Sequence, residues 1–113
     1  MKMDETEFVT PPAHVNFRAK KLFGCGEMKD ASLAFIGENG GGPMECHTHS
    51  HDHLFIVSRG EARVILGDET RIIKENESIL VRGDIPHSVW NNAAGECVII
   101  GINIENERGF ENE

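Results

Sequence analysis

The sequence predicts an all-β domain, an antiparallel sandwich or barrel with little helix, and three observations support this. Isoleucine and valine far outnumber leucine, and β-branched side chains favour strands over helices. Short apolar runs recur between clusters of Gly, Asn, Asp and Pro, which is the pattern of successive strands and turns. Beyond residue 30, no segment keeps an apolar period of 3.6 residues for about three turns, which argues against a helical bundle.

Successive apolar runs define the expected strands. They are Leu33–Ile36, Leu54–Val57, Ala62–Leu66, Arg71–Ile73, Ser78–Val81, Ser88–Trp90 and Val98–Ile104. The turn signals between them are Asn39–Pro43, Arg59–Gly60, Gly67–Asp68, Glu75–Asn76, Gly83–Asp84 and Asn91–Asn92. Short runs separated in this way predict antiparallel strands joined by tight turns.

The chain has 113 residues, which is enough for one domain with one modest core. We expect residues 31–104 to form the barrel. Residues 1–30 are less regular, and we expect an arm or edge strands that pack on the barrel or on a second copy. The acidic tail, residues 105–113, is expected to fray.

The net charge of −8 argues against nucleic acid and anionic membrane surfaces as partners, because both require clustered Lys and Arg. No apolar run approaches the roughly 18 residues that span a bilayer, and the first residues lack the apolar core of a secretion signal. Three cysteines without a CxxC pair suit reduced thiols better than a disulfide framework. These features predict a cytoplasmic protein.

Four of the six histidines fall in one window, at His47, His49, His51 and His53, and His87 follows a later turn. Side chains at i and i+2 of a strand share a face, so the first two project together. Imidazole is a common ligand of Zn, Fe, Cu, Ni and Mn, and several converging imidazoles would repel one another when protonated. The pattern predicts a metal site; the alternative is a solvated histidine-rich turn.

The remaining histidines have weaker assignments. His51 lies where the chain must turn, so it is expected beside the ligands or exposed, and His14 is expected on a surface loop. His53 opens the next apolar strand and shares its face with Phe55 and Val57.

Two spacings in this sequence have the form of motifs. The first is Gly41-x5-His47-x-His49-x3-His53-x6-Gly60, and the second is Val81-x-Gly83-x3-His87-x3-Asn91, with Pro86 directly before the histidine. They resemble the two motifs of the cupin superfamily, and every interval of the first one matches. Three positions depart from the family: His53 replaces its usual Glu, Glu75 its leading Gly, and Val81 its Pro.

The resemblance implies a double-stranded β-helix, the jelly-roll barrel of this family. It implies one divalent transition metal per chain (Fe, Mn, Ni, Cu or Zn), held by four ligands: His47, His49, His53 and His87. Small single-domain members of this family are commonly homodimers, so the resemblance also implies a homodimer. Trp90 has the opposite parity to His87 and Val89, which places it outside the barrel cavity, where a dimer interface could cover it.

A site of four imidazoles leaves the ion its full charge, which favours an anionic or enolisable small-molecule ligand. The family's carboxylate is absent as a general base, and the chain has no Tyr. We therefore expect a dioxygenase-like oxidoreductase. The alternatives are a non-enzymatic module that binds a metal or small ligand, and a metal-dependent isomerase or lyase.

The pocket walls are expected to be apolar. The candidate lining residues are Phe55, Val57, Val89, Phe35 and Gly101. Glu45 alternates with Cys46 and His47, so its carboxylate is a candidate for the surroundings of the metal ligands.

Overall fold

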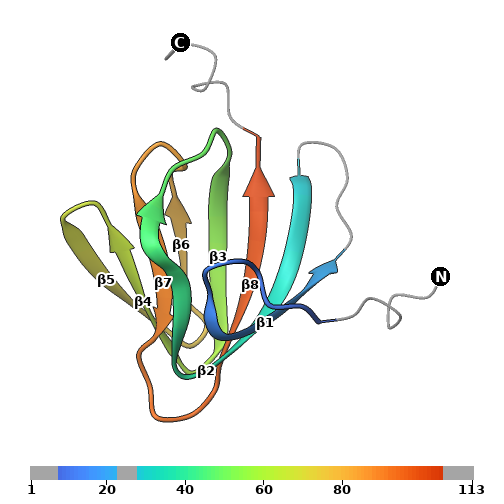
Figure 1. Ribbon diagram of the computed structural model, residues 1–113, viewed down its shortest axis with the longest axis vertical. Helices are drawn as coiled ribbons and strands as arrows, with labels where there is room; N and C mark the ends of the chain where they lie inside the picture. Colours follow the sequence, from blue (N-terminus) through green and yellow to red (C-terminus); the bar gives the residue numbers. More distant parts are fainter. Residues whose placement is uncertain (1–7, 23–27, 106–113) are drawn as a thin grey trace.

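The computed structural model describes residues 8–22 and 28–105, and this part of the chain contains eight strands and no helix (Figure 1). The predicted all-β class is confirmed. The strands are β1 (Val15–Leu22), β2 (Met28–His47), β3 (Asp52–Arg59), β4 (Glu61–Leu66), β5 (Glu69–Lys74), β6 (Ser78–Val81), β7 (His87–Asn91) and β8 (Cys97–Ile104).

The eight strands form one antiparallel sheet in the order β5-β4-β7-β2-β8-β3-β6, with β1 added beside β2. Except for the pairs β5–β4 and β1–β2, the neighbours in this order are not consecutive in the chain, and β5 and β6 at its two ends approach each other. The sheet thus curls into a nearly closed barrel, which confirms the predicted jelly roll. Closure of this kind protects the open edges that an extended sheet would expose.

The strand β2 crosses from one side of the barrel to the other. Its first half pairs with β8, where Ile36 lies opposite Cys97, and its second half pairs with β7, where Gly41 lies opposite Trp90. The turn predicted at Asn39–Pro43 is therefore wrong, because the strand bends there and continues. Gly41 has a φ of 150°, a conformation that L side chains rarely adopt, and a Cβ would collide with the Trp90 ring.

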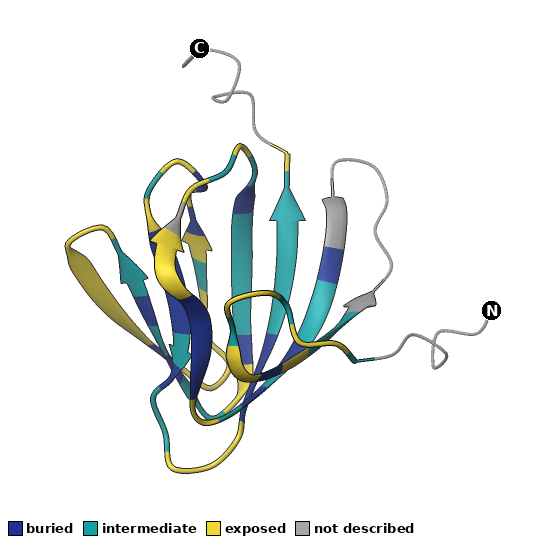
Figure 2. Cartoon of the chain, viewed as in Figure 1, coloured by how far each residue is buried: buried dark blue, intermediate teal, exposed yellow. Residues whose placement is uncertain are grey.

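The core lies inside the barrel and is aliphatic. Figure 2 shows buried segments on strands all around the barrel. The largest fully buried side chains come from five strands: Ile36, Val57, Val64, Val81 and Cys97. Burial of branched side chains on one face of every strand supplies the main driving force for closing the barrel.

The described part of the expected arm, residues 8–22, pairs with the barrel, and residues 1–7 and 23–27 of that arm lie outside the described residues. The strand β1 runs antiparallel to β2, and Val9 bridges Ala19. Residues 106–113 of the expected C-terminal tail lie outside the described residues. No helix that could cross a membrane occurs in the part of the chain that the structure describes.

Asn91 connects three backbone segments and provides a test of the fold. Its amide nitrogen donates to the carbonyls of Ile36 and Gly95, at 2.9 and 2.6 Å, and its Oδ1 accepts from the Ala93 amide. Asn91→Ala should lower the free energy of unfolding by about 2–3 kcal/mol, because buried backbone groups lose their partners. Denaturant titration measures this. The matched variant Asn92→Ala loses two part-buried side-chain contacts, with Glu61 and Arg63, and leaves no buried backbone group without a partner. Its loss should therefore be smaller than that of Asn91→Ala, and equal losses would contradict the assignment.

Candidate metal centre

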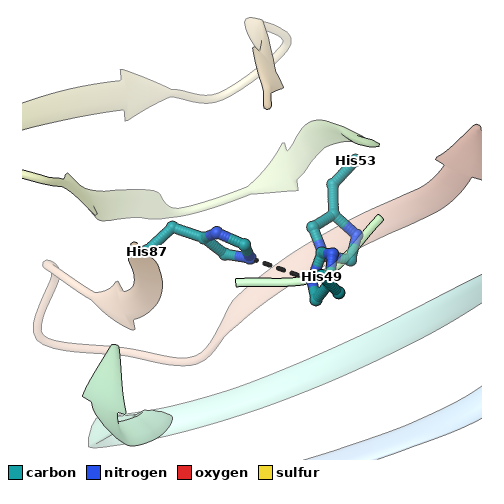
Figure 3. Close-up of side chains that lie close together, drawn as sticks. All are labelled: His49, His53 and His87. Atoms are coloured by element: carbon teal, nitrogen blue, oxygen red, sulfur yellow. Dashed lines mark hydrogen bonds between the residues drawn. The ribbon is translucent and has the colours of Figure 1, made fainter. Parts of the chain in front are cut away.

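Three imidazole rings, from His49, His53 and His87, converge at one end of the barrel (Figure 3). The Nε2 atom of His49 lies 2.8 Å from Nε2 of His53 and 3.1 Å from Nε2 of His87. Their ligand atoms all lie within 4.8 Å of one another. The structure thus gathers three of the four ligands that the sequence predicts.

The other nitrogen of each ring faces an oxygen. Nδ1 of His49 lies 2.9 Å from the His51 carbonyl, Nδ1 of His53 lies 2.7 Å from Oδ1 of Asn103, and Nδ1 of His87 lies 2.7 Å from the Ile85 carbonyl. Carbonyl oxygens only accept hydrogen bonds, so each neutral ring carries its proton on Nδ1. The three Nε2 lone pairs therefore point at one another. Converging ring nitrogens of this kind form the donor set of a metal-binding site.

This donor set fits a transition metal. Two ligands about 2.1 Å from one ion and at right angles to each other are about 3.0 Å apart, close to the separations between the Nε2 atoms. A histidine ligand usually donates its second N–H to a carbonyl or carboxylate, which fixes the tautomer and the ring plane. All three rings have such an acceptor.

Burial, and then the neighbouring His49 and His87, lower the pKa of His53 to about 3, from an ordinary value of 6.5. The hydrogen bond with Asn103 acts in the opposite direction. His53 is therefore neutral at physiological pH, which is the state that can bind a metal.

The loop between β2 and β3 carries His49, and backbone contacts with the turn before β7 hold this loop. The His49 amide donates to the Gly83 carbonyl at 2.8 Å, and the Gly83 amide donates to Oδ1 of Asp52 at 2.9 Å. A Cβ at Gly83 would overlap the His51 carbonyl and press on the His49 ring. Glycine at this position thus lets the loop approach closely enough for His49 to reach His87.

The remaining polar candidates are distributed as follows. The backbone of His47 lies opposite His87 in the β2–β7 ladder, but its side chain is outside the described part of the structure, so its role as a fourth ligand stays a prediction. The His51 ring stacks on His49 with centroids 4.0 Å apart. Glu45 is exposed and stands apart from the three clustered histidines. His14 packs against Phe17, away from the cluster.

An apolar cavity lies inside the barrel, an unfilled space of about 270 Å³ with its open mouth included. It is lined by Phe17, Ser32, Ala34, Ile36, Phe55, Val89, Ile99 and Gly101. Phe55 joins the cavity to the cluster, because its ring stacks on that of His53 at 5.0 Å.

Two residues expected in the cavity lie elsewhere. Val57 is in the packed core. Phe35 points away from the cavity and meets Phe8 edge to face at 5.3 Å, because it alternates along β2 with Ala34 and Ile36, which point inward.

Sequence reasoning missed the contribution of β8 to the site. This strand is apolar on both faces, so alternation does not show which face points inward. In the structure Ile99 and Gly101 line the cavity, and Asn103, two residues further, supports His53. Asn103 is the polar residue at the end of this inward series, and that was the available signal. Ser32, the polar lining residue, carried no comparable signal.

Comparison with protein families settles the relationship, because the Cupin domain family matches residues 36–103, more than half of the chain. The chain belongs to the cupin family. The matched segment includes His49, His53 and His87. No curated protein matches this cupin in sequence.

Solved structures confirm the fold of this cupin. The polyketide cyclase RemF from Streptomyces resistomycificus is 17% identical over 94% of this chain and 78% of its own, with a TM-score of 0.75. An RmlC-like cupin from Shewanella frigidimarina is 17% identical, covering 95% and 90%, with a TM-score of 0.72. A predicted oxalate decarboxylase from Thermotoga maritima is 9% identical, covering 92% and 96%, with a TM-score of 0.75. At these identities the likeness shows the fold alone.

The lowered pKa of His53 predicts an acid-sensitive metal-free protein. Below pH 6.5 the unfolded chain takes up a proton on His53 that the folded chain does not bind until about pH 3. The free energy of unfolding should therefore fall as the pH drops through this window, by up to about 1.4 kcal/mol per pH unit from this group. Urea titrations of metal-free protein between pH 7 and 4 measure the slope. The slope should be shallower in His53→Gln, and an unchanged slope would contradict the prediction.

Proposed function

We propose that this cupin is a dioxygenase-like oxidoreductase that acts on a small anionic or enolisable molecule. The divalent transition metal would be held by His47, His49, His53 and His87. The observation that carries the proposal is the convergence of three Nε2 atoms whose rings are each fixed through Nδ1. A bound divalent metal supplies Lewis-acid or redox activation of an anionic ligand.

The residues around the histidines would bind and shield the substrate. Phe55 and Val89 provide apolar walls next to the ligands, and such walls exclude water from the reacting part of a substrate. Gly101 leaves space, since a Cβ there would lie 3.3 Å from the Phe55 ring. The Ser32 hydroxyl can exchange one hydrogen bond with a polar substituent.

The lining of the cavity favours oxidative over redox-neutral chemistry. Isomerases and lyases need a positioned general base. The residues that line the cavity include no carboxylate and no histidine, and the chain has no Tyr. An acidic enol or phenol would bind as its anion to a metal held by four neutral imidazoles, and this would need no separate protein base.

The ligand assignment predicts which histidine variants lose metal. His53→Ala and His47→Ala should each weaken metal binding by more than the roughly 10–100-fold that changes behind a ligand typically cost. His14→Ala should bind as the unmodified protein does, because this ring lies against Phe17. Elemental analysis and competition with a chelator give these numbers. Equal metal content in all three variants would refute the four-histidine site.

The activity itself is tested with oxygen uptake. Protein reconstituted separately with Fe, Mn, Ni, Cu and Zn is supplied with β-diketones and catechols in an oxygen electrode. We expect substrate loss coupled to oxygen consumption with a redox-active metal and none with Zn, which has no redox chemistry. Anaerobic turnover with Zn would replace the proposal with an isomerase or lyase. Stoichiometric metal without turnover of any probe would favour the non-enzymatic binding module.

A further inference from the structure

The bend within β2 contains the only Asn-Gly pair of the sequence, Asn39–Gly40. The half of β2 before the bend pairs with β8, and the half after it pairs with β7. Figure 1 shows β2 curving between these two halves. Neither the core nor the histidine cluster includes Asn39, so neither explains why an asparagine stands before the glycines.

The residues around Asn39 form a β-bulge. In the register with β1, Asn16 stands opposite the whole segment of residues 37–40, none of which takes part in the ladder pairs of β2. Bulged residues leave the regular pattern of ladder hydrogen bonds. Asn16 holds the bulge at one point, because its Nδ2 donates to the Glu38 carbonyl at 3.2 Å. Asn39 itself thus lies in an irregular segment of the strand.

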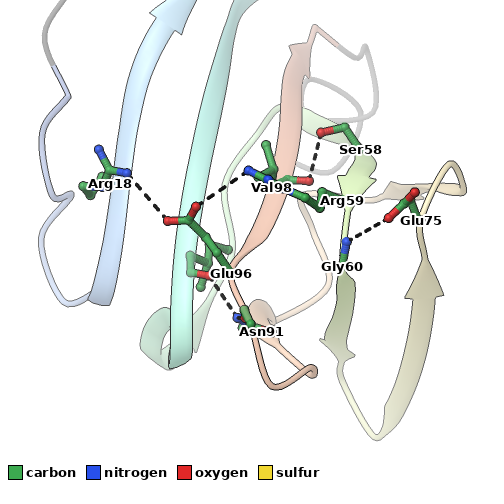
Figure 4. Close-up of polar contacts among 10 residues, drawn as sticks. Arg18, Ser58, Arg59, Gly60, Glu75, Asn91, Glu96 and Val98 are labelled. Carbon is green, nitrogen blue, oxygen red and sulfur yellow. Dashed lines mark hydrogen bonds and ion pairs between the residues drawn. The ribbon is translucent and has the colours of Figure 1, made fainter.

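Both ends of this bulge are held in place. Before it, the Ile36 carbonyl accepts a hydrogen bond from the amide of the buried Asn91 at 2.9 Å (Figure 4). After it, Gly41 pairs with Trp90 so closely that a Cβ would lie 2.5 Å from the indole ring. Because the strand is fixed on both sides, backbone movement near Asn39 is confined to the bulge.

The Asn39 side chain is open to reaction. The residue is exposed, and its side-chain amide makes no hydrogen bond or ion pair with residues 8–22 or 28–105. Its φ is 64°, in the left-handed region that asparagine adopts more readily than most residues. Gly40 has no Cβ to hinder the approach of the Asn39 side chain to the amide nitrogen between the two residues. The amide carbon of Asn39 is therefore accessible both to this nitrogen and to water.

We propose that Asn39–Gly40 is a site of spontaneous backbone modification, in which Asn39 loses its side-chain amide. The Gly40 nitrogen attacks Cγ of Asn39 and loses its proton, the side-chain nitrogen leaves as ammonia, and a succinimide ring forms. Water then adds to one of the two ring carbonyls and opens the ring. One opening gives aspartate, and the other gives isoaspartate, in which the main chain runs through Cγ. In sum, an amide and water give a carboxylic acid and ammonia, without an oxidant or a cofactor.

The modification changes the charge of the protein and the length of β2. A neutral amide becomes a carboxylate, so the net charge goes from −8 to −9. Isoaspartate also adds one carbon to the main chain between the two halves of β2. Since both ends of the bulge are held, the bulge absorbs this added length and the ladders on either side keep their register.

Asn76 provides a comparison within the same chain. It is also exposed, and its φ of 70° is left-handed like that of Asn39. The next residue, however, is Glu77, whose amide donates to the Lys74 carbonyl at 2.9 Å. This hydrogen bond and the Glu77 side chain both oppose attack on Asn76. Exposure and a left-handed backbone are thus shared by the two sites, and the following residue distinguishes them.

Peptide mapping tests the proposal. Full-length folded protein is incubated at neutral and at alkaline pH and digested with trypsin, and mass spectrometry follows the replacement of NH2 by OH. The tryptic peptides of residues 30–59 and 75–82 contain Asn39 and Asn76 as their only asparagines, and neither contains glutamine. We expect Asn39 to react at least about tenfold faster than Asn76, which is the effect of a barrier about 1.4 kcal/mol lower. The rate should rise with pH, because the attacking nitrogen loses its proton.

Two variants serve as controls. Asn39→Gln should abolish the mass change in the peptide of residues 30–59, because glutamine closes a larger ring far more slowly. Asn76→Gln should leave the rate at Asn39 unchanged. Circular dichroism checks that each variant is folded. If Asn39→Gln is not folded, the comparison of the two asparagines in the unmodified protein decides, since it needs no variant.

The remaining outcomes overturn the proposal. Equal rates at Asn39 and Asn76 would show that Gly40 and the bulge confer no reactivity. Modification of Asn39 in urea but not in the folded protein would show that the bulge protects this residue. Product that endoproteinase Asp-N cleaves completely before residue 39 would contain no isoaspartate and would exclude the succinimide route.

Discussion

The three hydrogen bonds made by the Nδ1 atoms are the constraint on which the site depends. They hold each ring with its proton facing away from the centre, so that three lone pairs meet where no proton separates them. The bonds come from different places: a loop carbonyl, a turn carbonyl and a side chain on β8. The barrel brings these three places together, and the close approach of Gly83 to the His49 loop completes the arrangement. The geometry of the histidine cluster therefore depends on the packing of the whole barrel.

Successive side chains of β8 point to opposite faces of the sheet, so the two faces of this strand have different surroundings. On β8, Ile99, Gly101 and Asn103 face the interior and reach from the cavity to the histidines. The residues between them, Ile100 and Ile102, point to the opposite side of the sheet, where they are half-buried and pair with Ile56 and Leu54. Both faces of β8 are apolar from Cys97 to Ile102. A strand exposed to water on one side would alternate with polar residues, and this one does not.

Much of the fold follows from the sequence, since each predicted run coincides with part of a strand and the motif spacings give the family. The ends of the strands and the bend within β2 were harder to predict. The segment around Gly41 has the composition of a turn, yet it continues β2 because tertiary pairing with Trp90 extends the ladder. In the site, His49, His53 and His87 could be assigned from spacing. Asn103 and Ser32 could not, because their roles depend on strand order, which local patterns do not encode.

The supports behind the histidines differ in how freely they can vary. Two of the acceptors are main-chain carbonyls, at His51 and Ile85, which every amino acid supplies. The third is a side-chain amide, on Asn103. A substitution at position 103 can therefore change the electronic character of His53 without changing a ligand. A carboxylate there would make the His53 ring a stronger electron donor, and an alkyl side chain would remove the hydrogen-bond acceptor. Among the three acceptors, only the one at position 103 can be changed by a point substitution.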